Sequence, residues 1–263
     1  MSERRIIRHL VNRRAGFDDT AISSDAISTT FLPPTSSPNS GGSGALWSPT
    51  SPSAGSRRPS LRGKGSVRGA VVDHASNREI VFESILERGM AEMLLARRDV
   101  TSVLDQPPPV RYLDAEGRGH KHTFDFLAIT SSGRRCAIAV KPAAKVVRSQ
   151  IEETISLIKA QIGDRFADTY LLRTERHITK ARVFNARLIL RSRRSRSEED
   201  ITTVRSIIER RPGEMLVADI VAAAKIGARG FNALIGLVDD GVVQAVGDER
   251  LDYPAYVRVA AAA

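Results

Sequence analysis

The sequence predicts an α/β protein with a mixed sheet flanked by helices, followed by a smaller helical domain closed by a hairpin. Residues 123–129 and 136–142 are short apolar runs on either side of a Gly-containing turn, which is typical of a buried β-hairpin. Residues 198–260 alternate helical periodicity with turn signals. Residues 23–60 are rich in Ser, Thr, Pro and Gly, a composition that buries too little apolar surface to fold. We therefore expect a disordered tail (1–75), a first domain (76–175), a basic connector (176–197) and a second domain (198–263).

Composition limits the class of protein. The one cysteine, Cys136, excludes an internal disulfide and fits a reducing cytoplasm. No apolar run reaches the length of a membrane span, and the N-terminus has no secretory signal. We expect a cytoplasmic bacterial protein that does not bind membranes and that associates with the nucleoid when bound to DNA.

The net charge of +10 is concentrated in one short stretch. Residues 176–197 contain eight Lys or Arg and no acid, whereas residues 198–263 contain seven Lys or Arg and eleven Asp or Glu. Such a basic run is either a solvated face or a phosphate-binding surface. We predict DNA contacts from four of its arginines, which are Arg191, Arg193, Arg194 and Arg196.

Two charges stand at one end of the predicted hairpin. If the turn is centred on Ser132 and Gly133, Asp125 lies opposite Val140, within one residue, and beside Lys141. A carboxylate can hold a hard divalent cation there, and a lysine can steady the attacking water in phosphodiester hydrolysis. The alternative is a salt bridge at a strand end.

A helix is expected from Ser76 or Asn77 to about Arg98, because apolar residues recur at three- and four-residue spacing from Phe82. Glu79, Glu83 and Glu87 would then stack along one side of it. They form either a solvated acidic stripe or the source of a second metal carboxylate.

Further elements complete the first domain. Strands are expected over residues 100–106, 109–113 and 169–173, with one amphipathic helix from Val147 to Gly163. His120 and His122 precede the Asp125 strand, either as a metal pair or, as is commoner, on a polar strand face.

Four blocks of this region resemble the nuclease domain of the TnsA family, whose members are transposon-end nucleases with the PD-(D/E)xK, restriction-endonuclease-like fold. The blocks are residues 83–87, 106–107, 123–127 and 137–144. The resemblance implies a metal-dependent endonuclease that cleaves one DNA strand at transposon ends. Glu87 and Asp125 would bind Mg²⁺ or Mn²⁺, the Val140 carbonyl would complete the shell, and Lys141 would position the water. Ala139 departs from the family, which has an acid or Gln two residues before the lysine.

The last domain resembles a winged helix, which the TnsA family also carries after its nuclease domain. Its third predicted helix, residues 228–240, would offer only Arg229 and Asn232 to a groove, and the domain is acidic overall. We therefore favour docking to a protein partner over DNA contact. The resemblance implies a DDE-type transposase subunit and an ATP-dependent regulator as partners.

Three hypotheses remain open from the sequence. The first is the transposon-end endonuclease, and the second is a non-catalytic nuclease-fold subunit that binds DNA or partners, which Ala139 favours. The third is a stand-alone repair or defence nuclease.

Overall fold

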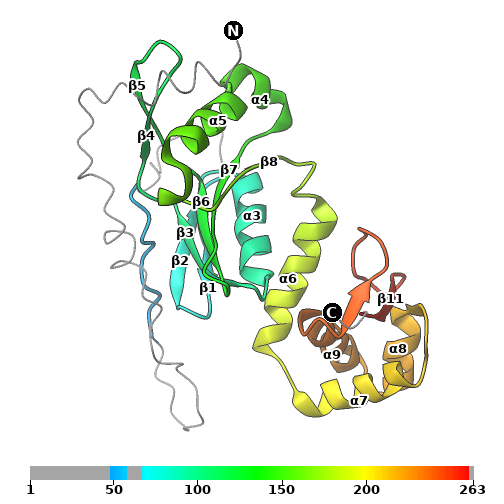
Figure 1. Ribbon diagram of the computed structural model, residues 1–263. Helices are drawn as coiled ribbons and strands as arrows, with labels where there is room; N and C mark the ends of the chain where they lie inside the picture. Colours follow the sequence, from blue (N-terminus) through cyan, green and yellow to red (C-terminus); the bar gives the residue numbers. More distant parts are fainter. Residues whose placement is uncertain (1–47, 58–66, 261–263) are drawn as a thin grey trace. The chain divides into compact units, whose positions relative to one another are not determined.

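The computed structural model describes residues 48–57 and 67–260 and divides into two compact units. Unit 1 runs to Ala91 and from Asp99 to His177, and unit 2 comprises Glu92–Arg98 together with the chain from Ile178 onward. Both α-helices and mixed sheets are present, so the expected α/β class is confirmed (Figure 1).

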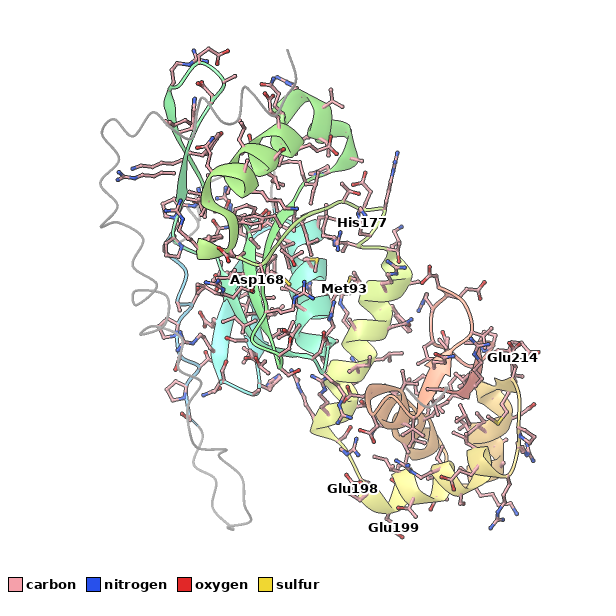
Figure 2. The ribbon with its side chains drawn as sticks, in the orientation of Figure 1. Met93, Asp168, His177, Glu198, Glu199 and Glu214 are labelled. Carbon is pink, nitrogen blue, oxygen red and sulfur yellow. The ribbon has the colours of Figure 1, made fainter. Side chains whose placement is uncertain are left out.

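The sheet at the centre of unit 1 has four strands in the order β3-β6-β7-β8. They are β3 (Val100–Asp105), β6 (Phe126–Thr130), β7 (Arg135–Val140) and β8 (Thr169–Arg173). Strand β6 pairs antiparallel with β3 and β7, while β8 lies parallel to β7. The predicted hairpin is confirmed, and its turn contains Gly133 at a φ of 78°. Asp168 fixes the start of β7, since its carboxylate accepts the Arg135 amide at 2.7 Å (Figure 2).

One face of this sheet packs against helix α5 (Ile151–Ile162). Leu127, Ala137 and Ala139 lie in the same buried cluster as Ile151 and Ile158 of α5. Because alternate residues point to opposite faces, Phe126 and Ile138 point away from α5, and both are also fully buried. Figure 1 shows helix α3 (Ile85–Ala96) beside the sheet on the side away from α5.

The helix predicted from Ser76 or Asn77 is wrong in its first third. Residues 69–82 instead form an antiparallel hairpin of β1 (Gly69–Asp73) and β2 (Arg78–Phe82), with Asn77 at a φ of 49° in its turn. Ile80 and Phe82 of β2 are buried and alternate with less buried neighbours, which is the strand period. Helix α3 begins only after Ser84, so Glu79, Glu83 and Glu87 do not form a helical stripe.

The boundary predicted at residue 75 is also wrong where the structure describes the tail. Besides β1, residues 48–57 lie along unit 1: Ser51 exchanges backbone hydrogen bonds with Asn77 and Glu79 at 2.8 and 2.9 Å. The Ser53 hydroxyl donates to the buried carboxylate of Asp105 at 2.7 Å. For residues 1–47 and 58–66 the prediction of disorder lies outside the described residues.

A second hairpin of unit 1 is formed by β4 (Val110–Leu113) and β5 (Gly119–His122), which within the described ranges pair with no other strand. The helix predicted between Val147 and Gly163 is two helices, α4 (Ala143–Ser149) and α5, separated by Gln150 at a φ of 50°. Gly163 ends α5 as expected and leads into the short helix η2 (Gly163–Arg165).

Unit 2 begins with a helix where the sequence suggested a connector. Thr179 caps helix α6 (Lys180–Arg194) by accepting the Arg182 amide. There follow α7 (Glu198–Glu209), β9 (Met215–Leu216), α8 (Val217–Ala224), α9 (Ala228–Asp239), β10 (Val243–Ala245) and β11 (Tyr256–Val259). The three strands pair antiparallel in the order β10-β11-β9. Figure 2 shows Glu198 and Glu199 at the start of α7, where they complement the helix dipole.

Helices α7, α8 and α9 enclose the core of unit 2, in which Val204, Ile220 and Leu234 are fully buried. Met215 and Leu216 pair with β11 as β9, so helix α8 begins only at Val217. In the part of the chain that the structure describes, no helix is long and apolar enough to cross a membrane.

Candidate functional site

Asp125 lies immediately before β6, and its backbone is held by both neighbouring strands. Its amide donates to the Ile138 carbonyl at 3.0 Å, and its own carbonyl accepts the Gln106 amide at 3.0 Å. The register pairs Phe126 with Ile138, so Asp125 comes opposite Ala139, one residue from the predicted position. Its carboxylate accepts the amide of Val140, the last residue of β7, at 2.6 Å. The side chain is thus fixed at the end of β7.

The electrostatic surroundings of Asp125 are unusual for a carboxylate. Its pKa is raised to about 7, mainly by burial and also by the nearby Glu87 and Glu83. The Val140 amide and the Lys141 ammonium act in the opposite direction but do not outweigh burial. Glu87, Glu83 and Lys141 therefore all lie within electrostatic reach of Asp125. A bound cation would relieve the repulsion among these carboxylates.

Glu87 has a structural role that accounts for its position. Its carboxylate accepts the Glu83 amide at 2.6 Å and the Ser84 hydroxyl at 2.8 Å, and the Ser84 oxygen accepts the Glu87 amide at 3.1 Å. Because Glu87 accepts the Glu83 amide in place of the Ser84 amide, the arrangement is a variant of the capping box at the N-terminus of α3. The Ser-x-x-Glu spacing from Ser84 is a signal for this helix start that apolar periodicity alone does not capture. Each Glu87 oxygen keeps a lone pair for a further partner.

Lys141 follows β7 directly, and its amide donates to the Arg173 carbonyl of β8 at 2.9 Å. This bond fixes the backbone of the half-buried lysine at the same sheet end as Asp125. Glu83, which the sequence left as one of three candidates, lies near this end as well and forms an ion pair with Arg57 at 2.9 Å.

Ala139 does not open toward the candidate site. Only 2% of its surface is exposed, and it lies in the apolar cluster with Phe124, Leu127 and Ile158. A carboxylate at this position would be buried among apolar side chains.

The two histidines ahead of Asp125 have separate surroundings. The His120 Nε2 lies 2.8 Å from the Asp114 carboxylate, and the ring stacks on Tyr112. The His122 ring meets Phe124 edge-on, and its buried Nε2 has no hydrogen-bond partner within the described residues. Burial, and secondarily Lys141, lowers the pKa of His122 to about 4. The interpretation of a metal pair therefore has no support, and His122 is instead a neutral group near Lys141.

The donor set suits a hard cation but is not assembled around one. Among residues 48–57 and 67–260, no three His, Cys, Asp or Glu side chains are close enough together to hold a metal ion. The second oxygen of Asp125, Oδ1, accepts no hydrogen bond from this part of the chain, and it is the kind of ligand that Mg²⁺ prefers. Glu87 would have to share or leave its capping bonds to contribute.

The four predicted DNA-binding arginines differ in their hydrogen bonds and ion pairs with the rest of the chain. Arg193 makes a two-pronged ion pair with Asp239, with both N–O distances at 2.8 Å, and it also donates to the carbonyls of Leu95 and Ala96. It therefore caps the C-terminus of α3. Arg196 pairs with Glu198 at 2.6 Å and with Asp240 at 3.0 Å. Arg191 is exposed and has no hydrogen bond or ion pair with any described residue, whereas Arg194 does have a partner.

Other cations of the basic stretch are also paired within unit 2. Arg187 contacts the buried carboxylate of Glu92 at 2.7 Å, and Arg182 contacts Asp248 at 3.0 Å. On α9, Arg229 lies 3.3 Å from Asp200 and Asn232 donates to the Ser195 carbonyl at 2.9 Å. The positive stretch and the acidic domain after it thus neutralise each other in large part.

Comparison with known proteins adds no identification. The chain matches no family model, and no curated protein matches it significantly.

Proposed function

We propose that the chain is a metal-dependent DNA endonuclease that cleaves one strand at transposon ends as a subunit of a heteromeric transposase. The observation that carries the proposal is the Asp125 carboxylate, held by the Val140 amide with Lys141 and two glutamates in electrostatic reach. Carboxylates within electrostatic reach of one another and of a lysine favour a divalent cation and an anionic substrate.

The residues would divide the work as follows. Asp125 and Glu87 would hold Mg²⁺ or Mn²⁺ through carboxylate oxygens, and the Val140 carbonyl would add a third oxygen. When bound, the cation supplies a Lewis acid and lowers the pKa of a water molecule. Lys141 would donate hydrogen bonds that position the attacking water and stabilise negative charge on the phosphate.

The order of elements supports the finer fold assignments. Helix α3, the antiparallel strands β3, β6 and β7, then α5 and the parallel strand β8 agree with a PD-(D/E)xK nuclease core. In unit 2, α7, β9, α8, α9 and the β10–β11 pair, with β9 on β11, agree with a winged helix. Because Arg229 and Asn232 already have partners, docking to a protein is the better assignment for this domain. The proposed partners are a DDE-type transposase and an ATP-dependent regulator.

A catalytically impaired subunit is the second candidate. Ala139 lies in an apolar cluster, and both Glu87 oxygens already accept hydrogen bonds. Such a chain would keep the fold and bind DNA or partners without cleaving.

Cleavage of labelled transposon-end DNA, with Mg²⁺ or Mn²⁺ and the co-encoded partner proteins, separates the two. Wild type should nick the DNA, and Lys141→Ala should abolish nicking without unfolding. Lys159→Ala, which removes an exposed lysine from α5, is the matched control and should nick like wild type. If neither wild type nor Lys141→Ala nicks the DNA, the nuclease is rejected in favour of the binding subunit.

A further inference from the structure

The outer face of the β4–β5 hairpin carries two cations directly opposite each other. The register pairs Arg111 with Lys121 and Val110 with His122. Val110 is buried, and Tyr112 packs against the same apolar cluster of unit 1. Because side chains alternate across a strand, Arg111 and Lys121 point away from that cluster, and both are exposed.

This pair has no compensating acid in the part of the chain that the structure describes. Neither Arg111 nor Lys121 forms an ion pair or side-chain hydrogen bond with residues 48–57 or 67–260. By contrast, Arg118 in the turn of the same hairpin is paired with Asp114 at 2.7 Å and Glu116 at 3.0 Å. Like charges facing each other across two strands oppose pairing of the strands. The arrangement therefore weakens the hairpin, which suggests a partner outside the chain.

The hairpin is joined closely to the candidate site. Strand β5 ends at His122, three residues before Asp125, and a fully extended chain of that length spans about 10 Å. The hairpin is not part of the four-stranded sheet, and Figure 1 shows it extending beyond the end of that sheet. On the α5 side the hairpin is anchored, since Gln161 exchanges two hydrogen bonds of 2.8 Å with the Leu113 backbone. Its outer face is thus a firmly placed cationic surface near Asp125.

We propose that Arg111 and Lys121 bind the phosphate backbone of the DNA whose strand is presented to Asp125. This inference rests on the proposed function for the nature of the ligand. DNA fits better than an acidic protein because the two exposed cations, which pair with no acid of the described residues, lie beside a candidate phosphodiester site. It also assigns DNA contact to unit 1, whereas Arg193 and Arg196 of the basic stretch are occupied by Asp239 and by Glu198 and Asp240.

The test is the double variant Arg111→Gln/Lys121→Gln in the full chain, with binding to a short fluorescent DNA duplex measured by anisotropy at several salt concentrations. The expected result is a Kd raised about tenfold or more. The slope of log affinity against log salt concentration should become shallower by about 1.8, since each phosphate contact contributes about 0.9 to it. The melting temperature should stay unchanged or rise, because the opposed like charges are gone. A merely structural role for the two residues would lower it.

The matched control is Arg210→Gln/Arg211→Gln, which removes two exposed charges next to α7 and leaves the hairpin intact. It should bind DNA like wild type. Equal weakening by both double variants would show a net-charge effect and overturn the inference, as would unchanged binding by the hairpin variant or an absence of DNA binding by wild type.

The inference and the proposed function can fail separately. If wild type binds DNA but never nicks it, and the hairpin variant loses binding, DNA contact by the hairpin is supported and the nuclease is rejected. If wild type nicks DNA, and the hairpin variant binds and nicks it equally well, DNA contact by the hairpin is rejected and the nuclease proposal is retained. Capture of polyglutamate by the hairpin with no affinity for DNA would assign the face to an acidic protein and overturn the inference.

Discussion

Replacing Asp125 with asparagine removes a half-buried negative charge and keeps an oxygen that can accept the Val140 amide. The pKa of Asp125 is about 7 in the folded protein, against an ordinary value of 3.8, mainly because of burial. The folded state therefore binds the proton more tightly than the unfolded state. This proton linkage stabilises the wild-type fold fully below pH 3.8, and the contribution is lost as the pH rises through 7.

The size of the effect follows from the two pKa values. Their difference corresponds to about 4 kcal/mol between low and high pH, of which roughly 2–3 kcal/mol falls between pH 5 and pH 8. The introduced asparagine does not titrate, so Asp125→Asn should gain that much stability over wild type on going from pH 5 to pH 8. A bound cation should cancel part of the difference, because it binds the ionised carboxylate of wild type only.

Urea unfolding monitored by circular dichroism at pH 5 and pH 8, with and without millimolar Mg²⁺, measures this. Hydrogen exchange in peptides from β6 and β7 assigns the change to unit 1. A stability difference that does not vary with pH would show that the Asp125 charge is well solvated, and the site argument would fail. Equal effects of Mg²⁺ on both proteins would refute metal binding by this carboxylate.

Three further outcomes are expected. Arg193→Ala should lower the free energy of unfolding of unit 2 by roughly 3 kcal/mol, since it leaves the buried Asp239 carboxylate with the longer ion pair to Arg98, at 3.9 Å. Arg191→Ala should change it little, and equal urea midpoints for the two variants would contradict this reasoning. Glu87→Gln should keep the cap of α3 and lose metal-dependent nicking. Glu87→Ala should lose nicking and also lower the stability by about 1 kcal/mol. Nicking by the glutamine variant would show that Glu87 is not part of the site. Ala139→Glu should destabilise unit 1 by several kcal/mol at pH 8, because the new carboxylate enters an apolar cluster; tighter Mg²⁺ binding at unchanged stability would show that position 139 is open to the site.

Partners of several arginines in the basic stretch come from distant parts of the chain. A count of charges over residues 176–197 is correct but does not say which of them face solvent. The carboxylates that occupy Arg187 and Arg193, those of Glu92 and Asp239, lie 95 and 46 residues away along the chain. No local pattern connects such residues. Conversely, the opposed pair of Arg111 and Lys121 depends on a strand register that the sequence does not predict, because β5 carries polar residues and no apolar alternation.

The sequence by itself determined the elements whose signals are local. Local signals, namely residue periodicity and turn residues, act over a few positions. They account for the β6–β7 hairpin, the strands β3 and β8, the end of α5 at Gly163 and the succession of α7, α8 and α9. Only the tertiary structure decided that residues 78–82 form a strand, because their apolar spacing is compatible with a helix and they become a strand by pairing with β1. It also decided the burial of Ala139, the raised pKa of Asp125 and the partners of the arginines. These depend on desolvation and on charges from distant segments, and both arise only when the chain has folded.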